Sequence, residues 1–222
     1  GFLADNLRDQ WAEDRIEHGY LISLREDLML DTAKLNFSIR SKAQKRLKLD
    51  TLISFLTAAD RSAHTARIHY MLRYATIREP FYGTEGTVRQ LESAGGFRTL
   101  QNRELVRALN DYVSFRAKVT DIQEIRDAQS DQFKEAIARV ADGSVINSMQ
   151  DFRRNASLPY FLRPPDGNPP LISERREDIS ALVFWVSNEN SLESMLGVLH
   201  SNLKTSAEDL ISKIDVELGV RD

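Results

Sequence analysis

The chain has no cysteine among its 222 residues, which excludes disulfides, thiolate metal ligands and cysteine nucleophiles. Proline and glycine are also scarce, with six and ten residues, and most of the prolines lie between Pro159 and Pro170. Because these two residue types interrupt helices, the rest of the chain is free to form long ones. No stretch of the sequence reaches the roughly eighteen apolar residues that a membrane span requires.

A strong charge of one sign is lacking too. The chain carries 30 lysines and arginines against 33 acidic residues, a net charge of −3. Nucleic-acid binding depends on a basic field that neutralises phosphates, so we expect no nucleic-acid partner. In contrast, 41% hydrophobic residues are enough for a packed core, and we expect a single domain over residues 1–222.

Helical spacing of apolar residues runs through about the first sixty positions. This stretch contains no proline and a single internal glycine, Gly19. Leucines and other apolar residues recur every three or four positions, which is typical of an amphipathic helix with one buried face. We therefore predict one very long helix over 1–59, or two nearly collinear ones, with Trp11, Ala43 and Leu47 in the buried stripe.

Start and stop signals divide the remainder into further helices. Ser62, Thr87, Asn102 and Ser173 are candidate N-caps. The predicted elements are short helices over 63–79 and 87–95, a long helix over 102–141, an irregular crossover strap over 144–172 and a long C-terminal helix over 173–218. With no alternating strand pattern, they predict an all-α fold, an elongated antiparallel helical bundle or coiled coil built on the long N-terminal helix.

No motif for catalysis, a cofactor or a metal ion stands out. No serine lies in a Gly-x-Ser-x-Gly elbow, and no glycine-rich segment has the lysine of a phosphate loop. The histidines lack the spacing of helical metal ligands; they are His18, His64, His69 and His200. We predict no catalytic residue, no cofactor and no metal, although distant residues could still converge between helices.

The largest local excess of charge is a basic cluster in the first helix. It consists of Arg40, Lys42, Lys45, Arg46 and Lys48. Such a cluster is either a solvated helix face or a docking site for an acidic partner, and the second interpretation predicts binding that weakens with salt.

A second candidate is a polar interruption in the apolar stripe of the last helix. Its central residues are Asn188, Glu189 and Asn190. Polar groups that face a bundle interior must be hydrogen-bonded to one another, to water or to a ligand. The interruption is therefore either an internal polar layer or a ligand site.

The segment 87–98 resembles a recurring segment in an uncharacterised family of bacterial proteins. Thr87, Leu91, Ser93 and Gly95 fit the pattern of that family, whereas Val88 stands where an aromatic residue is usual. A second match begins at Trp11 in the first helix. The resemblance implies a helical domain of unknown function that follows one N-terminal membrane span. From the residues alone, Thr87 and Gly95 are interpreted as the start and stop of a short helix and Leu91 as its core contact.

The resemblance places a membrane span directly before Gly1, in a bacterial inner membrane. Residues 1–20 contain two cations, Arg8 and Arg15, among more numerous acidic residues. Because cytoplasmic flanks are normally rich in lysine and arginine, we expect the domain to face the periplasm.

Together these observations favour a non-enzymatic, membrane-anchored helical interaction or scaffold domain with an unknown protein partner. The alternative is a ligand-binding sensory bundle, which the polar interruption at Asn188 to Asn190 permits. An enzyme with a site between helices comes third. We also expect a homo-oligomer, because so long an amphipathic helix rarely buries its whole stripe within one chain.

Overall fold

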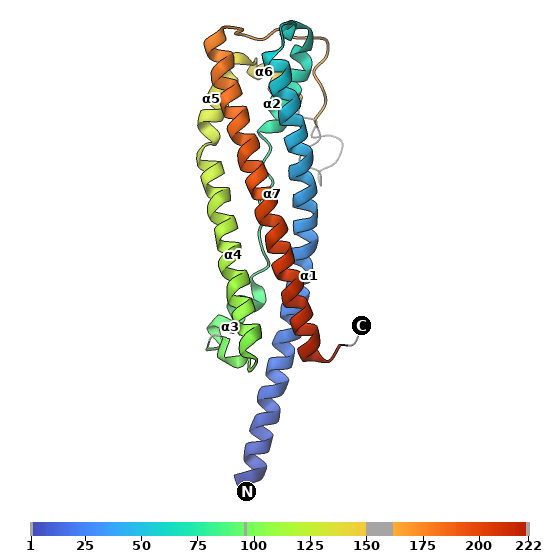
Figure 1. Cartoon of the computed structure of the whole chain (residues 1–222), viewed down its shortest axis with the longest axis vertical. Coiled ribbons are helices and arrows are strands. Elements are labelled where there is room, and N and C mark those ends of the chain that lie inside the picture. Colours follow the sequence, from blue (N-terminus) through green and yellow to red (C-terminus); the bar gives the residue numbers. More distant parts are fainter. Residues whose placement is uncertain (1, 96, 150–161, 221–222) are drawn as a thin grey trace. The chain divides into compact units, whose positions relative to one another are not determined.

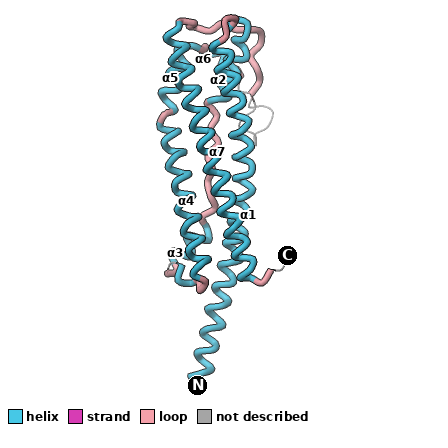
Figure 2. The backbone as a smooth tube through the Cα atoms, in the orientation of Figure 1, coloured by secondary structure: helices cyan, strands magenta, loops and turns pink. Residues whose placement is uncertain are grey.

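The computed structural model describes residues 2–95, 97–149 and 162–220, and within these ranges it is helical and contains no strand (Figures 1 and 2). The all-α prediction is confirmed. Helix α1 spans Phe2–Thr57, with 56 residues, and α7 spans Arg176–Leu218, with 43. The very long N-terminal helix that the sequence predicts is thus present, and it ends at Thr57 rather than at residue 59.

Shorter helices lie between α1 and α7. They are α2 (Thr65–Ala75), α3 (Gly86–Ser93), α4 (Arg103–Ala128), α5 (Ser130–Val140) and α6 (Gly143–Ser148), with 3-10 turns at Arg61–His64 and Phe97–Thr99. Where the sequence predicts one helix over 102–141, the structure has α4 and α5 with a break at Gln129. The predicted strap over 144–172 overlaps α6, and its residues 150–161 lie outside the described residues.

The described chain groups into two compact units. Unit 1 contains residues 1–39, 81–121 and 198–222, and unit 2 contains residues 40–80 and 122–197. Parts of α1, α4 and α7 belong to each unit. Each unit has a hydrophobic core of its own, and the single domain over the whole chain stays a prediction.

In unit 1 the core is built from leucines of α1, α3, α4 and α7. It includes Leu24, Leu28, Leu91, Leu105, Leu109, Leu203 and Leu210. Helices α1 and α7 run antiparallel here, because Arg25 pairs with Asp215 whereas Ser38, further along α1, pairs with the earlier His200.

In unit 2 the core joins the ends of α1 and α7 to α2 and α5. It includes Leu49, Leu52, Leu56, Ile68, Leu72, Phe133, Ile137, Leu182 and Val186. The antiparallel direction of α1 and α7 is the same within this unit, since Lys42 contacts Glu193 and Asp50 contacts Asn190.

The buried residues of the three longest helices recur every three and four positions, the heptad spacing of coiled coils. In α1 they are Glu17, Leu21, Leu24, Leu28, Asp31, Leu35, Ser38, Lys42, Lys45, Leu49, Leu52 and Leu56. In α4 they are Leu105, Leu109, Tyr112, Arg116, Val119, Gln123 and Arg126. In α7 they run from Ile179, Leu182, Val186, Glu189 and Glu193 through Leu196, His200, Leu203, Ala207, Leu210 and Ile214.

This repeat corrects the predicted stripe of α1. Leu47 is 68% exposed and Ala43 is also exposed, because Lys42 and Lys45 take the core positions beside them. Trp11, which is 70% exposed, precedes the first buried position at Glu17. The predicted stripe contains only apolar residues. In the structure the buried positions follow the heptad repeat, so polar side chains at those positions are buried as well.

Candidate functional site

Charged side chains from α1, α4 and α7 meet in the interior of unit 2. Lys42, Lys45, Arg126, Glu189 and Glu193 are each less than a tenth exposed, although charged groups are rarely buried so fully. Together with Arg78, from the segment after α2, we call these residues the buried ion layer. It unites two of the predicted sites, because the lysines belong to the basic cluster and Glu189 to the polar interruption.

Lys45 is the centre of the layer. Its ammonium nitrogen donates hydrogen bonds to Glu189 Oε1 at 2.8 Å, to Glu193 Oε1 at 2.9 Å and to the carbonyl of Ile77 at 2.8 Å. An ammonium group has three donors, so all the donors of Lys45 are satisfied within the protein.

The remaining cations surround the same two carboxylates. Lys42 Nζ lies 3.0 Å from Glu193 Oε2, and Arg126 Nη1 lies 3.4 Å from Glu193 Oε1. Arg78 donates to Glu189. The layer therefore holds three helices and the segment at Ile77 and Arg78 in one register, which is the best-attested use of buried polar groups in helical bundles.

Burial and the neighbouring charges both act on the pKa values of Glu193 and Lys42. Burial by itself would raise the pKa of Glu193, but the nearby Lys45, Lys42 and Arg126 outweigh it and lower that pKa to about 2. Burial lowers the pKa of Lys42, against the attraction of Glu193. Glu193 is thus an anion at neutral pH, and each of the two glutamates contacts more than one cation.

The predicted basic cluster is divided between the interior and the surface. Lys42 and Lys45 point inward, whereas Arg40 and Arg46 are exposed. Arg46 Nε donates to Asn190 Oδ1 at 3.4 Å. Lys48 lies over the ring of Tyr74, with its nitrogen 3.5 Å from the ring centroid, a cation–π contact.

The predicted polar interruption is hydrogen-bonded within unit 2. Asn188 Nδ2 donates to Gln129 Oε1 and Asn190 Nδ2 to Asp50 Oδ1, each at 2.6 Å. The adjoining cavity, lined by Ser41, Lys42, Tyr74 and Glu193 among others, has a volume of about 10 Å³. That is room for about one water molecule, and the side chains themselves fill the layer.

The residues of the family-like segment have structural positions in unit 1. Leu91 is buried, and Gly95 has a φ of 109° directly after α3, as a helix-closing glycine should. Thr87 is not the N-cap that the sequence predicts, because it lies inside α3. Its N–H donates to Asp27 Oδ2 at 3.1 Å, so a carboxylate of α1 supplies the cap. Ser93 bonds to the carbonyl of Gln90.

A second buried polar group lies in unit 1, and it is not among the sites that the sequence predicts. Asp31 accepts hydrogen bonds from Tyr112 Oη at 2.6 Å, Thr84 N at 2.7 Å and Thr84 Oγ1 at 2.8 Å. Burial raises the pKa of Tyr112, and the charge of Asp31 adds to the shift. Asp31 occupies a core position of the α1 heptad. An acidic residue at a core position of the repeat is the sequence signal that indicates a buried polar group.

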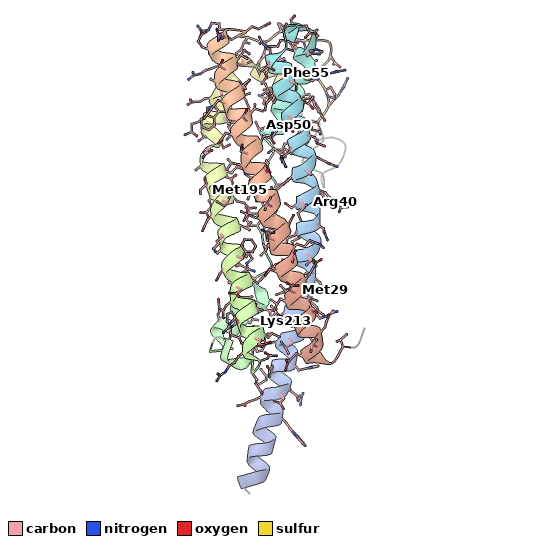
Figure 3. The ribbon with its side chains drawn as sticks, in the orientation of Figure 1. Met29, Arg40, Asp50, Phe55, Met195 and Lys213 are labelled. Atoms are coloured by element: carbon pink, nitrogen blue, oxygen red, sulfur yellow. The ribbon has the colours of Figure 1, made fainter. Side chains whose placement is uncertain are left out.

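The side of α1 that faces away from the core carries apolar side chains. Phe37 is 61% exposed, and Ile22, Met29 and Leu30 are also exposed (Met29 is labelled in Figure 3). These residues occupy outer positions of the heptad, which are normally polar. Helix α1 therefore has two apolar faces, and only one of them is covered in unit 1.

The described residues contain no group of three or more His, Asp or Glu side chains placed to hold a metal ion. Nor is any helix among them both long and apolar enough to cross a membrane. No protein family, no curated protein and no solved structure matches this chain.

Proposed function

We propose that this protein is a non-catalytic helical scaffold that pairs with a second copy of itself through the outer face of α1. We define that face by its residues in unit 1: Arg15, Gly19, Ile22, Glu26, Met29, Ala33 and Phe37. The observation that carries the proposal is the second, exposed apolar face of a helix whose first face is already buried.

The spacing of the outer face suits a helical partner. Its members recur at intervals of three and four residues, so they form a seam along the helix. From residue 15 to residue 37 the seam is roughly 33 Å long, at about 1.5 Å per residue. Each large apolar side chain that such a partner covers contributes about 1.5–3 kcal/mol.

The first turns of α1 also favour a partner. Every residue from Trp11 to Ile16 is exposed, so this stretch gains little side-chain burial within the described part of unit 1. A short helical stretch without packing is only marginally stable in water. A partner helix alongside it would supply the missing contacts.

Charge favours a second copy in the antiparallel direction. If Ile22 faces Gly19 of the second copy, Arg15 faces Glu26 of the second copy, and the same pair forms twice by symmetry. Trp11 then faces Leu30. A parallel pair would instead place Arg15 against Arg15 and Glu26 against Glu26, which is unfavourable.

Sedimentation equilibrium tests the proposal with the triple variant Ile22→Gln, Met29→Gln and Phe37→Gln. We expect a dimer for the wild type and a monomer for the variant. The matched control is Phe184→Gln, since Phe184 is 62% exposed but lies on α7 in unit 2, and this variant should dimerise like the wild type. A wild type that stays monomeric at the highest attainable concentration would contradict the pairing.

We also propose that the scaffold is attached to a bacterial inner membrane and faces the periplasm. The support for this attachment is the family resemblance and the acidic composition of residues 1–20. A reporter that is active only in the periplasm, fused to the C-terminus of the natural protein, tests it. Activity of a cytoplasm-dependent reporter instead would reject the orientation.

A further inference from the structure

A cavity of about 510 Å³ lies in unit 2, bordered by the end of α2, α5 and α6. Its volume is within the range of small-molecule sites, which is about 300–1,000 Å³. Ile137, Ala138, Ala141, Ile146 and Ile172 give it an apolar lining. The polar part of the lining includes two cations, Arg73 and Lys134, and one carboxylate, that of Asp142.

Arg73 has no carboxylate partner in the part of unit 2 that the structure describes. Among the described residues it forms no ion pair, and its Nη1 donates a hydrogen bond to the hydroxyl of Thr76 at 3.0 Å. Its Nε is shielded from solvent and has no hydrogen-bond partner in the described structure. Burial lowers the pKa of Arg73, the direction expected for a desolvated cation without a compensating charge.

Three other arginines with little solvent exposure, all in the described ranges, have carboxylate partners. Arg78 contacts Glu189, Arg116 contacts Glu85 and Arg126 contacts Glu193. Arg73 therefore differs from these three arginines in having no carboxylate partner among the described residues, and it is one of the residues that line the cavity.

The other charged groups of the lining do not neutralise the positive charge of Arg73. Lys134 Nζ lies 3.2 Å from Asp131 Oδ1, but both side chains are largely exposed and such a pair is weak. The carboxylate of Asp142 accepts from the N–H and the hydroxyl of Ser144, both at 2.7 Å. The carboxylate of Asp142 is thus hydrogen-bonded within its own turn, while Arg73 and Lys134 are available to an incoming anion.

We propose that this cavity binds an amphipathic anion, a carboxylate attached to an apolar chain or ring. The carboxylate would lie at Arg73 and Lys134, and the apolar body would cover Ile137, Ile146 and Ile172. A guanidinium group without a carboxylate partner pairs strongly with an incoming carboxylate, especially where water is partly excluded. This site is independent of the outer face of α1, which lies in unit 1.

Isothermal titration calorimetry with octanoate tests the proposal, with octanol and octylammonium as neutral and cationic probes of the same chain length. We expect octanoate to bind at least about tenfold more tightly than octanol, because octanol lacks the charge-assisted hydrogen bond. Octylammonium should bind most weakly, since its charge is repelled by Arg73 and Lys134. Equal affinity for octanoate and octanol would overturn the proposal, as would no octanoate binding up to its solubility limit.

Variants assign the binding to this cavity. Arg73→Gln and Lys134→Gln should each weaken octanoate binding by about tenfold, with the helical circular-dichroism signal unchanged. Ala138→Trp keeps both charges but fills the apolar lining, so it should also weaken binding. The control is Lys118→Gln, an exposed cation of α4 in unit 1, which should bind octanoate like the wild type. Binding that survives both Arg73→Gln and Ala138→Trp would place the ligand elsewhere and overturn the assignment.

Discussion

At the scale of single residues, the polar side chains at core positions distinguish this bundle from a simple apolar one. The buried ion layer places Lys42, Lys45 and Arg126 against Glu189 and Glu193 in the interior of unit 2. A buried pair of charges gives little net stability compared with apolar residues of similar size, yet removing one partner is costly. The layer is therefore a strong constraint on register and a sensitive point for mutation.

Glu193→Gln should lower the free energy of unfolding by about 3 kcal/mol at neutral pH. The variant leaves Lys42, Lys45 and Arg126 around a neutral amide, so their buried charges lose compensation. Urea unfolding followed by circular dichroism measures the change. Glu135→Gln, at an exposed position of α5, should change stability by less than about 0.5 kcal/mol. Equal stability of the wild type and Glu193→Gln would show that the layer does not hold the unit together.

The same glutamate makes a pH-dependent contribution to stability. Its pKa is about 2 in the folded protein, against an ordinary value of 4.5. A lowered carboxylate pKa stabilises the folded state above the ordinary value, and this stabilisation is lost as the pH falls from 4.5 towards 2. In that window the wild type should lose stability more steeply than Glu193→Gln. Parallel slopes in melting temperature against pH would contradict the assignment.

At the scale of the elements, several helices begin with caps from residues distant in the sequence. Asn168 accepts hydrogen bonds from Thr65 Oγ1 at 2.8 Å and from Ala66 N at 2.9 Å, and it donates to the carbonyl of Ser62 at 2.7 Å. The sequence predicts Ser62 as the cap of this helix, which is wrong. Asn168 belongs to the segment after α6, so this segment fixes the start of α2.

Asn168→Ala should destabilise unit 2 by about 1 kcal/mol, the usual cost of a lost N-cap. The amides at the start of α2 should also exchange faster with deuterium, because Ala66 loses its acceptor. Hydrogen exchange measured by mass spectrometry reports this locally. The control is Asn202→Ala, at an exposed position of α7, which should leave exchange in α2 unchanged. Unaltered protection of Ala66 in Asn168→Ala would rule out the capping role.

How much of each element could be predicted depends on whether its signal is local. Asn102 caps α4 as predicted, accepting from the N–H groups of Glu104 and Leu105, because a local cap depends on near neighbours. The break at Gln129 has no local signal, since neither glycine nor proline lies there. It coincides with the hydrogen bond from Asn188 of α7, a contact between residues far apart in the sequence.

The candidate sites follow the same rule. The sequence points to Lys42 and Lys45 as part of a basic cluster and to Glu189 as part of a polar interruption. It therefore assigns these residues to two separate sites. Only the antiparallel pairing of α1 with α7 within unit 2 shows that they face one another. No sequence pattern points to Arg73 and Lys134, because the cavity that they line forms only where three short elements meet.

At the scale of the whole molecule, the proposed dimer predicts that the two α1 helices run antiparallel, and charge reversal tests this direction. Arg15→Glu and Glu26→Arg, introduced singly, should each weaken the dimer, because each places like charges opposite one another in the antiparallel arrangement. The double variant restores opposite charges and should dimerise nearly like the wild type. Sedimentation equilibrium at low ionic strength measures this, since salt screens the pairs. Failure of the double variant to recover would exclude the antiparallel arrangement with Ile22 opposite Gly19.

The two opposed apolar faces of α1 have a consequence for how such helices are detected. Leu24 and Leu28 lie on one side, and Ile22 and Met29 lie on the other, so their contributions to any one-sided measure of amphipathicity cancel. A criterion that selects helices with a single apolar face would therefore not select α1. The pattern that identifies it is a pair of interleaved heptads on one helix, an inner one with polar residues among its leucines and an outer one with apolar residues among its charges.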